Sequence, residues 1–163
     1  MGASICCAED EADTQFTIFD LSALKKQCLI LYPFLIFACN WCSYAGADLA
    51  GTSRIQYPTN TRIVRTMCSG RVDPDFVKHA YNQGAGAVML TGCRPQDCHY
   101  ISGNDFALKR QKKIRRWMLK NGIAEERFLI AWMSAAEGKK FADTVDRMSE
   151  IARQVKKAAE RAA

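Results

Sequence analysis

An uninterrupted apolar run over residues 29–38 is the strongest constraint on the fold of this chain. It reads Leu-Ile-Leu-Tyr-Pro-Phe-Leu-Ile-Phe-Ala and does not alternate with polar residues, so a strand here needs cover on both faces. Strands of this kind occur in parallel sheets that are flanked by helices. Pro33 cannot donate to a strand ladder, and we therefore expect the regular strand to begin after it. The run is too short for a membrane span, which needs about 20 residues.

Three further strand patterns alternate with helix patterns along the chain. We expect these strands at 61–67, 86–91 and 127–133. We expect helices in the small-residue segment up to Gly51, from Asp73-Pro74 to Gly84, over 104–120, and after Ser134-Ala-Ala-Glu137, whose spacing fits a capping box. This alternation predicts an α/β fold with a doubly wound parallel sheet of about four strands, either flavodoxin-like or Rossmann-like.

The charge is distributed unevenly between the start of the chain and the rest. Residues 1–20 hold five acids and no Lys or Arg, so the remainder has 23 bases against 12 of the 17 acids. We expect a poorly ordered or partner-docking leader over 1–26 and a single α/β domain with a C-terminal helix over 27–163. With no convincing export signal we expect a cytoplasmic, reducing location, where thiols act as ligands or nucleophiles rather than as disulfides.

Five cysteines follow directly on expected strands. Cys39 and Cys42 follow the first strand, Cys68 the second, and Cys93 and Cys98 the third. The carboxyl ends of parallel strands meet at one edge of the sheet, so we expect these thiols to lie close together. Four thiolates can hold zinc, a 2Fe–2S cluster or a 4Fe–4S cluster, and a C-x-x-C pair can also perform thiol–disulfide exchange. The residues alone leave these alternatives open.

Longer strings around these cysteines resemble the delta subunit of methyl-viologen-reducing hydrogenase, an iron–sulfur protein that accompanies heterodisulfide reductase in methanogens. The strings are Cys-Asn-Trp-Cys-Ser-Tyr-Ala-Gly-Ala-Asp-Leu-Ala-Gly-Thr-Ser-Arg at 39–54, Met-Cys-Ser-Gly-Arg-Val at 67–72, Gly-Cys-Arg-Pro-Gln-Asp-Cys-His-Tyr at 92–100 and Trp-Met-Ser-Ala-Ala-Glu-Gly at 132–138. The resemblance implies a 2Fe–2S electron-transfer subunit that is not catalytic alone. It implies transfer from a hydrogenase, or a formate dehydrogenase, to the flavin-containing subunit of heterodisulfide reductase, where electron bifurcation occurs.

The resemblance also implies the ligand set. The family cysteines correspond to Cys39, Cys42, Cys68, Cys93 and Cys98, of which four are expected as cluster ligands. We expect the two short-range pairs to be ligands and Cys68 to be the extra thiol. We expect His99 to form a hydrogen bond beside the cluster rather than to bind it, and Trp41 and Tyr44 to pack around it.

The loop between Cys93 and Cys98 departs from the family pattern at two positions. The family loop usually reads Cys-His-Pro-Gly-Asp-Cys, whereas this chain has Arg94 and Gln96 in place of the His and the Gly. If that glycine has a positive φ, Gln96 is strained by roughly 1 kcal/mol.

The helix at 104–120 is strongly basic and is expected to be a solvated face or a docking surface for an acidic partner. We expect neither nucleic acid nor a membrane as a partner. The alternative function is a zinc-stabilised binding module that uses this helix as its contact surface.

Overall fold

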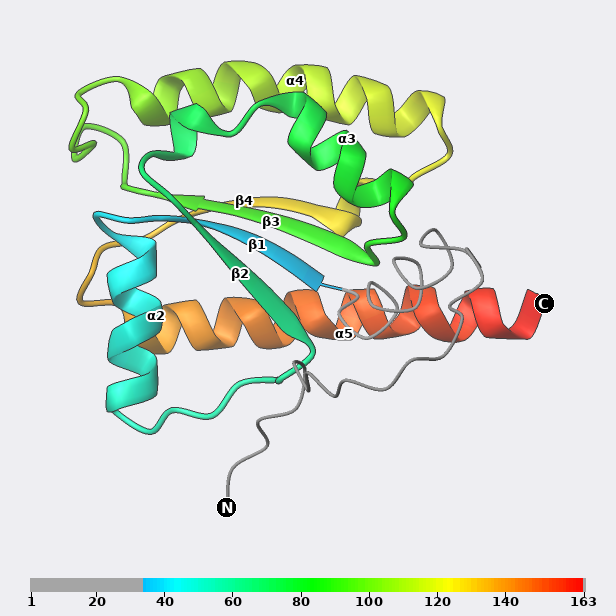
Figure 1. The fold of residues 1–163 in the computed structure, drawn as a ribbon, viewed down its shortest axis with the longest axis horizontal. Helices are drawn as coiled ribbons and strands as arrows, with labels where there is room; N and C mark the ends of the chain where they lie inside the picture. The colour runs from blue at the N-terminus through cyan, green and yellow to red at the C-terminus, as the bar shows by residue number, and fades with distance from the viewer. Residues whose placement is uncertain (1–33, 163) are drawn as a thin grey trace, which may run out of the picture.

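A computed structural model describes residues 34–162 of the chain (Figure 1). Its strands are β1 (Phe34–Cys39), β2 (Thr61–Thr66), β3 (Ala87–Gly92) and β4 (Phe128–Trp132). Its helices are α2 (Ser43–Thr52), α3 (Pro74–Asn82), α4 (Gly103–Lys120) and α5 (Gly138–Ala162), with 3-10 turns at Ser69–Arg71 and Glu125–Arg127. The leader expected over 1–26 lies outside the described residues, and its role stays a prediction.

The four strands form one parallel sheet in the order β2-β1-β3-β4. Helices α3 and α4 cover one face of the sheet and α2 and α5 cover the other (Figure 1), so the doubly wound α/β prediction is confirmed. The strand order decides between the two expected topologies, because 2-1-3-4 is the flavodoxin-like order. The chain changes direction across the sheet between β1 and β3, and ligands of such folds bind at this switch point.

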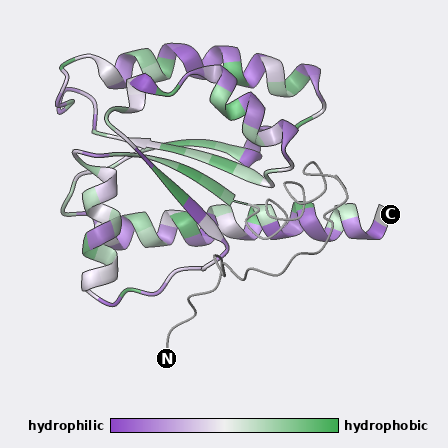
Figure 2. Cartoon of the chain, viewed as in Figure 1, coloured by the Kyte–Doolittle hydropathy of each residue, from purple (hydrophilic) through white to green (hydrophobic). Residues whose placement is uncertain are grey.

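The two central strands are buried on both faces, as the apolar run at 29–38 predicted. In β1 the side chains alternate between two cores: Phe37 packs with residues of α3 and α4, and Ile36 packs with residues of α5. All six residues of β3 are buried. Figure 2 shows these strands in green and much of α4 in purple, in keeping with a solvated outer face on that helix. None of the helices within 34–162 is long and apolar enough to cross a bilayer.

The helix starts and the edge strand differ in part from the predictions. Asp73 caps α3 as expected, with its carboxylate accepting a hydrogen bond from the Asp75 N–H at 3.0 Å. The expected capping box is confirmed in part. The Glu137 carboxylate accepts a hydrogen bond from the Ser134 N–H at 2.7 Å, and α5 begins directly after Glu137, at Gly138. Strand β2 is an edge strand, and its residues are only partly buried or exposed.

Candidate metal centre

Three cysteine sulfurs converge where β1 and β3 end side by side. Cys39 is the last residue of β1, Cys42 immediately precedes α2, and Cys93 follows β3. Their sulfurs all lie within 4.8 Å of one another, and the Cys39 and Cys93 sulfurs are 4.0 Å apart. All three are buried. Because β1 and β3 are adjacent parallel strands, their carboxyl ends place these thiols at the switch point of the sheet.

The other two cysteines border this group. Cys98 is partly buried and packs against the three central thiols. Cys68 follows β2, and its sulfur accepts a hydrogen bond from the Gly70 N–H at 3.4 Å. Both sulfurs adjoin Gly103, where an added Cβ would overlap the Cys68 sulfur and lie 3.1 Å from the Cys98 sulfur. The structure thus brings all five predicted residues to one edge, while the choice of four ligands among them stays a prediction.

Two buried hydroxyls fix the loop that follows β1. The Ser43 Oγ accepts a hydrogen bond from the Cys39 N–H at 2.9 Å and lies 2.8 Å from the Thr91 Oγ1. The Thr91 hydroxyl also lies 3.2 Å from the Phe37 carbonyl oxygen. These contacts tie the start of α2 to both central strands. Neither hydroxyl was predicted from the sequence, although a Thr inside an apolar strand and a Ser directly after a Cys pair were visible signals.

The thiols differ in their readiness to ionise. A hydrogen bond from the Cys42 thiol lowers the pKa of Cys39 to about 6, although burial opposes this shift. The same contact, together with burial, raises the pKa of Cys42. Burial raises the pKa values of Cys68 and Cys93. The site therefore favours one thiolate among neutral thiols, and binding of a metal to all of them would release the remaining protons.

An aromatic group lies beside the thiols at the surface. The His99 ring stacks on the Trp41 ring with centroids 3.7 Å apart and an angle of 13° between the planes. The Trp41 Nε1–H donates to the Tyr100 hydroxyl at 3.3 Å. The His99 backbone N–H lowers the pKa of the Cys93 thiol, and the hydrogen bond expected from the His99 side chain beside a cluster stays a prediction. Trp41 packs at the rim of the site, as predicted, and is 45% exposed.

The family model for the delta subunit of methyl-viologen-reducing hydrogenase matches residues 34–156. The chain belongs to this family. The match begins at the first residue of β1 and includes all five cysteines of the site. The predicted resemblance to the delta subunit family is confirmed.

Similar proteins include both separate subunits and parts of longer chains. An iron-sulfur subunit of an F420-non-reducing hydrogenase from Archaeoglobus profundus is 42% identical over 118 residues, covering 72% of this chain and 86% of that protein. The vhc iron-sulfur subunit from Methanococcus voltae is 48% identical over 105 residues, covering 64% of this chain and 73% of that protein. One subunit of the Ferredoxin/F(420)H(2)-dependent CoB-CoM heterodisulfide reductase from Methanosarcina acetivorans is 48% identical over 128 residues, or 78% of this chain, but the chain spans only 16% of that protein's length.

Two residues of the loop between Cys93 and Cys98 were expected to differ from the family pattern. Gln96 has a φ of +72°, in the left-handed region that favours glycine, so the condition for the expected strain is met. Arg94 forms an ion pair with Glu137 at 2.6 Å. The Asn104 side chain donates to the Arg94 carbonyl oxygen at 2.9 Å. The arginine thus links the cysteine loop to the turn before α5.

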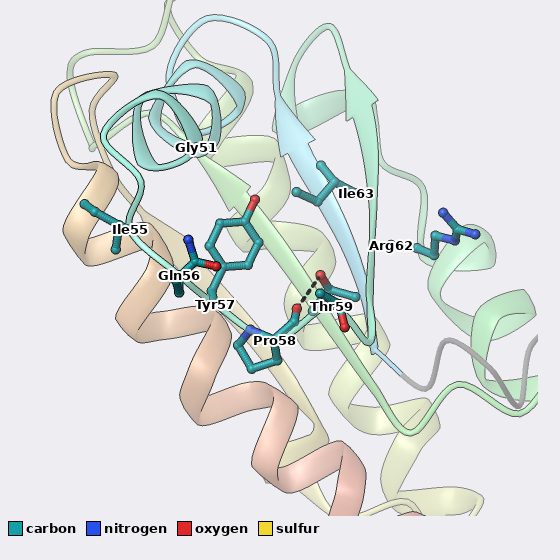
Figure 3. Close-up of a pocket in the computed structure, with 9 residues that line it drawn as sticks. Gly51, Ile55, Gln56, Tyr57, Pro58, Thr59, Arg62 and Ile63 are labelled. Carbon is teal, nitrogen blue, oxygen red and sulfur yellow. Dashed lines mark hydrogen bonds between the residues drawn. The ribbon is translucent and has the colours of Figure 1, made fainter. Parts of the chain in front are cut away.

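A separate hollow lies between α2 and the edge strand β2 (Figure 3). Tyr57, Pro58 and Ile63 contribute to its lining, and the Thr61 hydroxyl donates to the Pro58 carbonyl oxygen at 3.3 Å. Thr61 is the first residue of β2, so this end of the hollow lies at the opposite edge of the sheet from the cysteines. None of the five site cysteines lines it.

Proposed function

We propose that this chain is a non-catalytic electron-transfer subunit that holds a 2Fe–2S cluster at the thiol site. It takes electrons from a hydrogenase, or from a formate dehydrogenase in its place, and passes them to the flavin-containing subunit of a heterodisulfide reductase complex, where electron bifurcation occurs. It does so in the cytoplasm, without contact to membrane or nucleic acid. The observation that carries the proposal is the convergence of Cys39, Cys42 and Cys93 within 4.8 Å in a buried site.

The donor set fits an iron–sulfur cluster. Such clusters are held by cysteine thiolates and supply one-electron redox chemistry. We propose Cys39, Cys42, Cys93 and Cys98 as the ligands, with Cys68 as the extra thiol. The chain also shields the site, because the three central thiols are each at most 5% exposed. Burial and hydrogen bonds to the sulfurs, such as the one from the His99 backbone, are the means by which a protein adjusts a cluster's reduction potential.

The burial of the C-x-x-C pair argues against thiol–disulfide exchange. Cys39 has the lowered pKa that an attacking thiol needs. However, Cys39 is 1% exposed and Cys42 is 4% exposed. A protein disulfide cannot reach sulfurs that are enclosed in this way.

The relatives support the choice of cluster and partners. Two are named iron-sulfur subunits of F420-non-reducing hydrogenases, and they cover most of the described residues. Another, named as part of a heterodisulfide reductase, contains a segment similar to this chain within a much longer polypeptide. Similar segments thus occur both as separate hydrogenase subunits and within a reductase polypeptide. This is expected of a subunit that connects the two enzymes.

The test is metal and sulfide analysis of the full chain purified without oxygen. We expect two irons and two acid-labile sulfides per chain, visible absorption, and an EPR signal from the reduced 2Fe–2S centre. Protein that contains stoichiometric zinc and no iron would overturn the proposal.

A zinc-stabilised binding module is the second candidate. The close spacing of the three central thiols also fits a zinc ion, because sulfurs around one tetrahedral zinc ion are about 3.8 Å apart at Zn–S distances of about 2.3 Å. The basic helix α4 would then be its contact surface. The same metal analysis separates the two functions in one step.

A further inference from the structure

Large apolar side chains are exposed around the thiol site. Trp41 is 45% exposed, Tyr100 is 49% exposed and Ile101 is 87% exposed. Met67, just after β2, and Phe106, in the first turn of α4, are each about half exposed at the same edge of the sheet. We call these five residues the apolar rim. Exposed apolar groups that gather beside a functional site, with Trp and Tyr among them, are typical of protein contacts.

Ile101 is the member of the rim that folding alone explains least. Its φ is +66°, and a β-branched residue in the left-handed region is an outlier. Outliers of this kind gather at functional sites, where contacts offset their strain. Within residues 34–162 the Ile101 side chain is almost fully exposed, so an Asn here would suit the backbone better and would cost no burial.

A stripe of positive charge runs along α4 from the apolar rim. The helix has seven bases and one acid, Asp105. Five exposed bases share one side of it at helical spacing, and we call them the basic stripe: Lys109, Lys112, Lys113, Arg116 and Lys120. The other two bases are engaged, since Arg110 donates to backbone carbonyls and Arg115 pairs with Glu125 at 2.9 Å. No ion pair joins the stripe to another described residue.

The rim and the stripe meet at the start of α4. The Lys109 ammonium lies over the Phe106 ring, 5.5 Å from its centroid. Gly103, at the start of the same helix, adjoins the Cys68 and Cys98 sulfurs. One continuous surface thus joins the thiol site, the apolar rim and the basic stripe.

We propose that this surface docks an acidic face of a redox protein subunit, with the apolar rim as the contact nearest the thiols and the basic stripe as the steering element. This proposal rests on the proposed electron-transfer function. Charge complementarity favours an acidic partner, and like-signed charge along one helix speeds the encounter with it. His99 already stacks on the Trp41 ring and Lys109 lies over the Phe106 ring, and the most exposed member of the rim, Ile101, is aliphatic. These contacts favour a protein over nucleic acid, whose bases would need free ring faces on which to stack.

Cross-linking of the assembled complex tests the occupant of this surface. The full chain is purified with its partner subunits from its own cells without oxygen, treated with a carbodiimide that joins lysine amines to carboxylates, and mapped by mass spectrometry. We expect links from Lys109, Lys112 or Lys113 to Asp and Glu residues of an identified redox subunit. The proposal would be overturned if the links led only to residues 1–20 of this chain or to a second copy of it, or if no link to another protein formed. It would also be overturned if nuclease disrupted the complex.

Charge reversal tests the steering role against a matched control. With the purified partner subunit as the probe, Lys113→Glu with Arg116→Glu is expected to slow association about tenfold or more at low salt, and by less than about twofold at high salt. The control is Arg147→Glu with Lys157→Glu, which makes the same change of net charge on α5, behind the sheet. Equal slowing by both pairs would mean that net charge alone acts, and would contradict the proposal.

Substitution in the apolar rim tests the contact itself. Ile101→Asn suits the positive φ, so it removes the apolar side chain without disturbing the fold. We expect it to speed dissociation about tenfold at low and high salt alike.

The control is Leu119→Asn, which removes a residue that is 77% exposed at the far end of α4 and is expected to change dissociation little. An unchanged dissociation rate for Ile101→Asn would overturn the rim's role. Iron content is measured in the wild type and in every variant. Wild-type protein that contains no iron would refute the proposed function, whereas a changed dissociation rate at full iron content reports on this surface alone.

Discussion

The Cα of Gly103 packs directly against the sulfur of Cys68, leaving no space for a Cβ. The same glycine also faces Gly70, where an added Cβ would lie 2.5 Å from the Gly103 carbonyl oxygen. Two glycines in contact thus allow the start of α4 to approach the turn that carries Cys68. This approach brings the helix to the thiol site.

Gly103→Ala is therefore expected to disturb the metal centre. The added methyl group must displace the Cys68 and Cys98 sulfurs, at a cost of about 1–3 kcal/mol. We expect a lower iron content and a shifted reduction potential in protein purified without oxygen. Gly51→Ala is the control, because a Cβ there meets nothing within 4 Å and its φ is not positive. Equal iron content in both variants would show that Gly103 does not position the site.

Serine substitutions test the proposed ligand set. Cys93→Ser removes a sulfur from the central group and is expected to abolish the visible absorption of the cluster. Cys68→Ser is expected to keep the cluster with an altered EPR spectrum, because this thiol adjoins the ligands without being one. Cys28→Ser, which lies before the family match at 34–156, serves as the control. Loss of the cluster in Cys68→Ser with its retention in Cys98→Ser would exchange the roles of these two cysteines.

Gln96→Gly is expected to stabilise the protein. The φ of +72° costs a non-glycine residue about 1–2 kcal/mol, whereas glycine costs about 0.4–1 kcal/mol through the entropy of the unfolded chain. Gln96 is exposed, so little packing is lost, and the net gain is up to about 1.5 kcal/mol in the free energy of unfolding. Urea titration measures it. Gln96→Ala removes the side chain but keeps the strain, so a gain in both variants would contradict this explanation.

Glu137 should make stability depend on pH in the acid range. Hydrogen bonds from the Ser134 N–H and from Arg94 lower the pKa of Glu137 to about 2, from an ordinary value of 4.5. The unfolded chain therefore binds this proton more readily, so the contribution is complete above pH 4.5 and is lost as the pH falls towards 2. Unfolding measured across this window should show a smaller loss in Glu137→Gln than in the wild type. Identical pH profiles would show that the carboxylate does not contribute.

Local patterns were sufficient to predict the elements and the neighbourhood of the site. The apolar run at 29–38 predicted a strand that is covered on both faces, and Asp73-Pro74 predicted the start of α3. The close packing of Gly138 against α2 was not predicted, and an added Cβ at this glycine would lie 2.9 Å from the Ala50 nitrogen. That contact is between segments far apart in the sequence, so spacing within one segment could not reveal it.

The sequence by itself determined that four strands alternate with helices and that a cysteine lies at or just after the end of each of the first three strands. Hydrophobic periodicity and turn residues are local features of a segment, so they can be recognised without the tertiary structure. Only the tertiary structure decided that β1 lies beside β3. That pairing brings Cys39, Cys42 and Cys93 together, and the approach of Gly103 places Cys68 and Cys98 around them. Such convergence depends on crossover connections and on glycine contacts between distant segments, which local sequence patterns do not encode.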